Sequence, residues 1–166
     1  MEVVTVILVA YASKHGATEG IARHIAERLG SRGKQATAVS VDGLADIGQP
    51  EAVVLGSAVY AGSWMKEAVE FARAHRATLA QVPVWLFSSG PLGEQVVDEE
   101  QQPKQLPELQ EMRDPREHHV FFGALDPANL GFAERMIVKA VKAPGGDFRD
   151  WDEIAAWADG IADALG

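Results

Sequence analysis

The chain contains no cysteine among its 166 residues. This absence excludes disulfide bonds, thiolate metal sites and a cysteine nucleophile. The first apolar run is too short to span a bilayer, and no basic residue precedes it as in a secretory signal. We therefore expect a cytoplasmic protein with at most peripheral membrane contact.

Positive charge is also scarce, since 15 basic residues stand against 24 acidic ones and give a net charge of −9. Nucleic acid is excluded as the main partner because phosphate backbones require a basic face. A redox partner protein steered by charge is compatible with this balance. The length and the hydrophobic content of 47% predict a single domain over residues 1–166 with one core.

Short apolar runs alternate with helical patterns along the chain. The runs cover residues 3–10, 52–56, 82–87 and 119–125, with a weaker fifth at 36–41. They are continuous rather than alternating, which is typical of strands covered on both faces of a parallel sheet. The last helical pattern is the clearest, and Asp150 with Glu153 forms a capping box at its start. This order of elements predicts an α/β doubly wound domain.

Ligands of such sheets bind beyond the carboxyl ends of the strands. Three segments rich in Gly and Ser follow three predicted strands and should therefore share one edge: YASKHGAT from Tyr11, GSAVYAGSW from Gly56 and SSGPLG from Ser88. No GxGxxG follows the first strand and no GxxxxGK[ST] occurs, which excludes the dinucleotide fingerprint and the triphosphate loop. Gly56-Ser57 stands where a response regulator carries its phospho-acceptor aspartate.

The first segment suits a phosphate group. Ser13 and Thr18 supply hydroxyls, while Gly16 and Ala17 keep the backbone accessible at a helix N-terminus. Lys14 and His15 either add charge or face water. The alternative is an ordinary strand-to-helix turn with Thr18 as the N-cap.

The other two segments suit a flat ring. Tyr60 could stack on a planar ligand or pack on the surface, and Gly62 could let a backbone carbonyl turn toward the ligand. Trp64 is more simply read as a core residue. Ser88 to Gly90 offer hydroxyls and backbone N–H groups, with Pro91 stiffening the turn. The three segments together describe a site for a phosphorylated flat ring.

YASKHGAT resembles the phosphate loop of the flavodoxins, with Ser13, Gly16 and Thr18 at the matching positions. The resemblance implies a flavodoxin-like five-stranded parallel sheet of order 2-1-3-4-5, an extra helix in the C-terminal region, and FMN as cofactor. The residues expected to contact FMN are Ser13, Lys14, His15, Gly16, Ala17, Thr18, Ala58, Val59, Tyr60, Ala61, Gly62, Ser88, Ser89, Gly90, Pro91 and Gly93.

The C-terminal third, from Gly123 through a helix at about 131–141 to Asp152, resembles the flavodoxin-like protoporphyrinogen IX dehydrogenase family. The resemblance implies an FMN oxidoreductase with a porphyrinogen substrate and a quinone acceptor. The predicted 131–142 helix has an apolar stripe flanked by basic residues, which would either lie on a membrane surface or pack on the sheet.

Two other functions remain open. A flavodoxin-type electron carrier between proteins is favoured by the acidic charge, and Glu94 with residues 98–100 would form an acidic rim beside the third segment. A binding module that keeps only the fold is the remaining alternative. No acid–base residue is evident, because the five histidines are scattered and only His15 lies in a candidate site. We therefore assign no catalytic residue.

Overall fold

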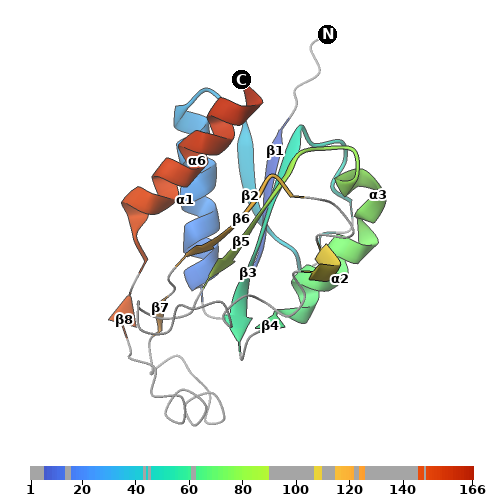
Figure 1. The fold of residues 1–166 in the computed structure, drawn as a ribbon, viewed down its shortest axis with the longest axis horizontal. Coiled ribbons are helices and arrows are strands. Elements are labelled where there is room, and N and C mark those ends of the chain that lie inside the picture. The colour runs from blue at the N-terminus through green and yellow to red at the C-terminus, as the bar shows by residue number, and fades with distance from the viewer. Residues whose placement is uncertain are drawn as a thin grey trace.

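The computed structural model is a parallel sheet covered by helices on both faces (Figure 1). It describes residues 6–13, 16–42, 44, 46–60, 63–89, 107–109, 115–121, 124–125, 146–147 and 149–166. The parallel strands are β1 (Ile7–Ala12), β2 (Ala36–Ser40), β3 (Ala52–Tyr60), β5 (Val84–Ser89) and β6 (Glu117–Phe121). Their order is β2-β1-β3-β5-β6, which confirms the predicted order 2-1-3-4-5 of the parallel strands.

The described residues also include three very short strands. β4 (Ser63–Trp64) pairs antiparallel with the end of β3, where Val59 faces Trp64. β7 (Ala124–Leu125) and β8 (Gly146–Asp147) form a separate two-stranded antiparallel sheet. The predictions did not include these pieces, because two-residue strands leave no hydrophobic period to detect.

Two pairs of helices cover the two faces of the sheet. In Figure 1, α1 (Ala17–Ser31) and α6 (Trp151–Leu165) lie on one face, and α2 (Lys66–Ala74) and α3 (Arg76–Leu79) lie on the other. Because both faces are covered, all six residues of β1 are buried. Ile7 and Val9 belong to the core cluster under α1 and α6, whereas Leu8 and Ala10 belong to the cluster under α2. The continuous apolar run therefore fills two cores with alternate residues.

The strand predictions agree with the structure in position and differ at the ends. The first strand begins at Ile7, while residues 3–5 of the predicted 3–10 run lie outside the described part. Of the short helix predicted near 105–112, residues 107–109 are described and helical. The predicted extra helix near 131–141 also lies outside the described residues.

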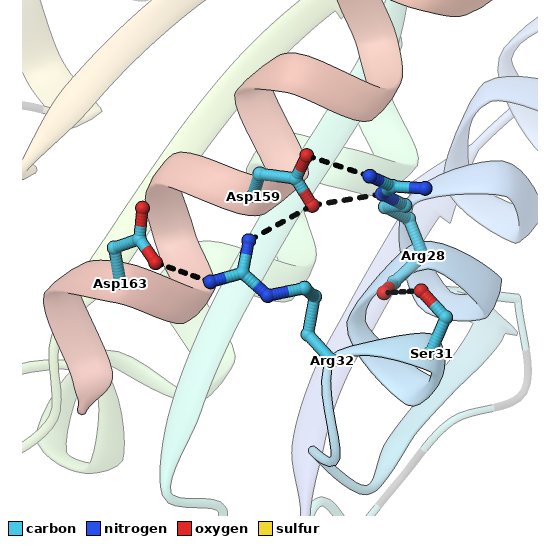
Figure 2. A network of polar contacts seen from close by, with 5 residues as sticks. All are labelled: Arg28, Ser31, Arg32, Asp159 and Asp163. Atoms are coloured by element: carbon cyan, nitrogen blue, oxygen red, sulfur yellow. Dashed lines mark hydrogen bonds and ion pairs between the residues drawn. The ribbon is translucent and has the colours of Figure 1, made fainter.

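A network of ion pairs joins α1 to α6 (Figure 2). The Arg28 guanidinium donates through Nε and Nη2 to the two carboxylate oxygens of Asp159, at 2.8 and 2.9 Å. Arg32 pairs with Asp159 at 3.2 Å and also with Asp163. The hydrogen bond from Arg28 is the largest cause that holds the pKa of Asp159 below its ordinary value. The bidentate ion pair between Arg28 and Asp159 holds the last turns of α1 beside α6. Exposed ion pairs of this kind contribute little to the free energy of unfolding.

The start of α6 shows one half of the predicted capping box. The Asp150 carboxylate accepts hydrogen bonds from the backbone N–H groups of Asp152 and Glu153, so the predicted N-cap is confirmed. The Glu153 side chain serves a tertiary contact instead, with its Oε1 atom 2.7 Å from Nε2 of His119 in β6. The local pattern thus predicted the helix boundary correctly but not the partner of the glutamate.

Gly56→Ala should destabilise the fold strongly. A Cβ atom on Gly56 would lie 2.0 Å from Cζ of Phe87, whose ring is fully buried on the neighbouring strand. Overpacking of this kind costs about 1–3 kcal/mol or more. Urea unfolding checks this, with Gly160→Ala in α6 as control, because its Cβ would meet no atom within 4 Å. Equal unfolding midpoints for the two variants would contradict the prediction.

Candidate functional site

The three candidate segments leave the sheet at the same level. Ala12 at the end of β1 is in register with Ser57 of β3, Ser57 with Ser88 of β5, and Ser88 with Val120 of β6. This row crosses four adjacent parallel strands near their carboxyl ends. The expectation that the segments share one edge is therefore confirmed for their described parts.

The first segment places open backbone at the start of α1. Gly16 is the N-cap residue and has φ of 87°, in the left-handed region that favours glycine. A Cβ atom there would meet nothing within 4 Å, so the space beside it is open. The Gly16 N–H donates to Oγ of Ser13 at 3.0 Å, and none of the described side chains caps the terminus. The unpaired N–H groups of the first helical turn are thus available to an anion.

Thr18 gives the clearest sign of a ligand at this turn. Its side chain is 1% exposed, and its Oγ1 atom has no hydrogen-bond partner among the described residues. Leaving a buried hydroxyl unpaired is costly, and such groups normally have partners. The prediction of Thr18 as a possible N-cap is wrong, because Gly16 occupies that position.

An acidic side chain of the same turn is already paired. The Glu19 carboxylate accepts a hydrogen bond from the Tyr11 hydroxyl at 2.8 Å and from Arg23 at 3.2 Å. The Tyr11 hydrogen bond, followed by the one from Arg23, lowers the pKa of Glu19. Burial, reinforced by Glu19, raises the pKa of the Tyr11 phenol. Arg23 balances the negative charge of Glu19 close to the proposed anion site.

The second segment is held at both ends by strand pairing and a buried hydroxyl. Tyr60 pairs with Ser63 across the β3–β4 hairpin. Ser57 is fully buried, and its Oγ atom accepts from the backbone N–H of Met65 at 2.9 Å and donates to the carbonyl of Ala58 at 2.8 Å. The Ser57 hydroxyl therefore connects β3 to Met65, which is the N-cap residue of α2.

A second buried hydroxyl connects the second and third segments. The indole Nε1–H of Trp64 donates to Oγ of Ser88 at 2.8 Å, and Nε2 of His118 lies 2.8 Å from the same oxygen. An indole nitrogen can only donate, so the single hydroxyl proton of Ser88 is available for His118. The Ser88 hydroxyl therefore joins the Trp64 and His118 rings, and the His118 tautomer with its hydrogen on Nδ1 is the one that would accept the Ser88 proton.

His118 is neutral in this setting. Burial, with a smaller contribution from neighbouring His119, lowers the pKa of His118 to about 4. A neutral imidazole is the form that can accept the Ser88 proton. His118 is thus a structural partner of the third segment, and its Nε2 atom is occupied.

The structure describes about half of the predicted site. Ser13, Gly16, Ala17, Thr18, Ala58, Val59, Tyr60, Ser88 and Ser89 are described, with the backbone alone for Tyr60, and all lie at or just beyond the carboxyl ends of β1, β3 and β5. Lys14, His15, Ala61, Gly62, Gly90, Pro91 and Gly93 lie outside the described residues. The stacking role of Tyr60 stays a prediction.

Sequence reasoning missed the residues that support these segments. Ser57, Trp64 and His118 were not assigned to the site, yet their contacts hold its second and third segments. Trp64 is 3% exposed, which agrees with its interpretation as a core residue. The sequence offered one signal for such a contact, namely the pair His118 and His119 at the start of an apolar run. A polar ring that is buried in a strand needs a hydrogen-bond partner.

An open helix start after the first strand of a doubly wound sheet, with two further polar segments at the same edge, is the arrangement in which α/β sheets of this class bind their ligands. The flavodoxin domain model matches residues 8–152. The chain belongs to the flavodoxin domain family, and FMN is its cofactor. No curated protein sequence matches the chain.

Solved structures agree with this fold. Oxidised flavodoxin 1 from Bacillus cereus has a TM-score of 0.65 at 13% identity, covering 98% of this chain and 100% of that one. A flavodoxin from the domain Archaea has a TM-score of 0.63 at 16% identity, covering 97% and 99%. Rubredoxin oxygen:oxidoreductase from Desulfovibrio gigas has a TM-score of 0.60 at 16% identity over 96% of this chain, which spans 36% of that longer protein.

The described residues fit the phosphate end of FMN. The orphaned hydroxyl of Thr18, the Ser13 hydroxyl and the open N-terminus of α1 are neutral donors of the kind that bind phosphate at a helix start. Within the described ranges, no group of three or more His, Asp or Glu residues could hold a metal ion. No described helix is long and apolar enough to cross a membrane.

The neutral state of His118 should make the protein less stable in mild acid. Because the pKa of His118 in the folded chain lies near 4, below its ordinary value of 6.5, the unfolded chain takes up the proton first as pH falls. The free energy of unfolding therefore decreases from about pH 7 to about pH 4. His118→Gln keeps an acceptor and cannot titrate, so urea midpoints of this variant should fall less over that range.

His75→Gln serves as the control, since His75 lies in a different part of the chain, next to Phe71. It should retain the full pH dependence of the parent protein. If His118→Gln loses stability with acid as steeply as the parent does, the assignment of a buried neutral His118 is wrong.

Proposed function

We propose that residues 13–18 hold the phosphate of FMN and that residues 58–62 and 88–93 flank its flavin ring. The observation that carries this proposal is the buried, unpartnered Oγ1 of Thr18 beside the uncapped start of α1. The common level of Ala12, Ser57 and Ser88 supports the placement of the other two segments.

FMN, when bound, supplies the redox chemistry, because the flavin can accept electrons from a donor and release them to an acceptor. The chain contributes binding and orientation. Ser13 and Thr18 offer hydroxyl groups, and the first turn of α1 offers N–H groups and the positive end of its dipole. Ser57 and Ser88 keep the second and third segments at fixed positions through buried hydrogen bonds.

We propose further that the protein is an oxidoreductase of the protoporphyrinogen IX dehydrogenase type. In the overall reaction, electrons and protons leave a porphyrinogen and a quinone is reduced to the quinol. Support comes from the resemblance of the segment from Gly123 to Asp152, which follows the second flavin-flanking segment along the chain. The described part of the chain offers no free acid or base at the site, which suits chemistry carried by the cofactor.

The second candidate is an electron carrier that exchanges electrons with other proteins and has no organic substrate. Two observations favour it. The net charge of −9 suits docking to a basic redox partner. The archaeal flavodoxin also matches this chain over almost the full length of both proteins.

Ser13→Ala combined with Thr18→Val should weaken FMN binding by about tenfold or more. Each hydrogen bond to a charged group contributes about 1.5–3 kcal/mol, and about 1.4 kcal/mol corresponds to a factor of ten in affinity. Riboflavin lacks the phosphate, so its affinity should stay unchanged. Flavin fluorescence titration of the flavin-free chain measures both values. Equal affinity of parent and variant for FMN would contradict the placement of the phosphate.

An activity comparison separates the two candidates. The FMN-loaded protein should oxidise protoporphyrinogen IX with menaquinone as acceptor if it is the dehydrogenase. If it is the carrier, it should instead mediate electron transfer between a flavodoxin reductase and cytochrome c and leave the porphyrinogen unchanged. Free FMN at the same concentration shows how much porphyrinogen is oxidised without the protein. The Ser13→Ala, Thr18→Val variant shows whether the activity requires FMN bound to the protein.

A further inference from the structure

A cationic side chain lies against the first half of α1 at a position that glycine leaves open. A Cβ atom built on Gly20 would be 2.7 Å from Nη1 of Arg149 and 3.6 Å from the ring of Trp151. Gly20 lies inside the helix, where glycine is about 1 kcal/mol less favourable than alanine. No positive φ accounts for glycine at this position. An alanine there would push the flexible end of the Arg149 side chain away from its present position.

An aromatic ring holds the guanidinium in place. Cζ of Arg149 lies 4.7 Å from the centroid of the Trp151 ring, within the range of a cation–π contact. The Trp151 ring in turn meets His24 of α1 edge to face, with 5.1 Å between ring centroids. Trp151 is 39% exposed and is the exposed large hydrophobic residue among those described. Its ring therefore serves to position Arg149 at the surface of α1.

The guanidinium lies beside Gly20, one helical turn from the proposed phosphate site at the start of α1. Side chains on a helix tilt toward its N-terminus, so the space above Gly20 covers the preceding turn. That turn begins at Gly16, because the N–H of Gly20 donates to the Gly16 carbonyl at 3.0 Å. One helical turn spans about 5.4 Å, which places the cation within electrostatic reach of an anion beside Gly16 and Thr18.

The charges at this turn favour a dianion. The start of α1 carries the partial positive charge of the helix dipole, and Arg149 adds a full positive charge to the same region. The nearby Glu19 carboxylate is held by Tyr11 and Arg23. A phosphate monoester at the first turn interacts favourably with the dipole and with the guanidinium together.

We propose that Arg149 is a cation of the FMN phosphate site, positioned by Trp151 in the space that Gly20 leaves open. The assignment rests on the proposed placement of the phosphate at residues 13–18. Arg149 comes from the segment that precedes α6, more than a hundred residues from the phosphate loop. Its role is to distinguish phosphorylated flavin from flavin without a phosphate.

The test compares FMN and riboflavin binding to the full chain after removal of flavin. Arg149→Gln keeps a planar polar side chain without the charge. It should lower the affinity for FMN by about tenfold, the scale of one charge interaction across a helical turn, and change riboflavin affinity by less than about twofold. The decrease of FMN affinity with rising salt should also be shallower in this variant.

Gly20→Ala is the independent perturbation, because it moves the guanidinium without removing the charge. It should lower FMN affinity in the parent chain and have no further effect in the Arg149→Gln background. Gly30→Ala in the same helix is the matched control, since its Cβ would meet nothing within 4 Å. It should leave FMN affinity unchanged. Circular dichroism and melting curves establish that each variant is folded.

The outcomes separate this inference from the function on which it rests. Unchanged FMN affinity in Arg149→Gln would overturn the assignment, as would equal losses for FMN and riboflavin. If Ser13→Ala with Thr18→Val selectively weakens FMN binding while Arg149→Gln does not, Arg149 alone is wrongly assigned. If neither variant distinguishes FMN from riboflavin, the placement of the phosphate fails as well.

Discussion

The parallel register of β1, β3 and β5 is the constraint on which the site depends. It brings Ala12, Ser57 and Ser88 to one level, so that three segments far apart in sequence begin side by side. A shift of one residue would turn every side chain of a strand to the opposite face. The hydroxyl of Ser88 would then point away from Trp64, and the second and third segments would lose their link. Burial of both sheet faces specifies this register, because a slipped strand would exchange the contents of the two cores.

The buried hydroxyl groups at this edge are of two kinds: some have hydrogen-bond partners among the described residues, and one has none. This difference separates the groups that support the site from the group that is available to a ligand. Ser57 and Ser88 are fully buried, and each has partners that fix the chain around it. Their hydrogen bonds avoid the cost of an unpaired buried hydroxyl and determine where the neighbouring segments start. Thr18 is buried to the same degree and has no partner among the described residues. An unsatisfied group beside an open helix terminus is what a binding site for an anion requires, whereas a plain turn would have satisfied it internally.

The fold could be predicted from the sequence because the hydrophobic patterns of its strands and helices each extend over several neighbouring residues. Five apolar runs separated by helical periods are sufficient for a doubly wound sheet, and the resemblance of the first segment supplied the strand order. The prediction of a phosphate loop rests on an equally local pattern, since Ser13, Gly16 and Thr18 lie within six positions. The supporting contacts were not predictable, because Trp64, Ser88 and His118 meet only after the strands have paired. Glu153 shows the same limit, as a tertiary contact with His119 prevails over the local capping pattern.

An acidic chain can hold a phosphate because the interactions that decide binding are short-ranged. At physiological salt the potential of distant charges decays over about 8 Å, so a net charge of −9 spread over the surface acts weakly at one helix terminus. Hydroxyl groups, backbone N–H groups and the helix dipole act within hydrogen-bonding distance and are oriented before the ligand arrives. Glu19 would oppose an anion at this turn, and Arg23 offsets its charge. The overall charge is therefore free to serve solubility and the choice of partner while the first turn of α1 keeps a local positive potential. Because the two effects act over different distances, a small domain with a net negative charge can bind an anionic cofactor.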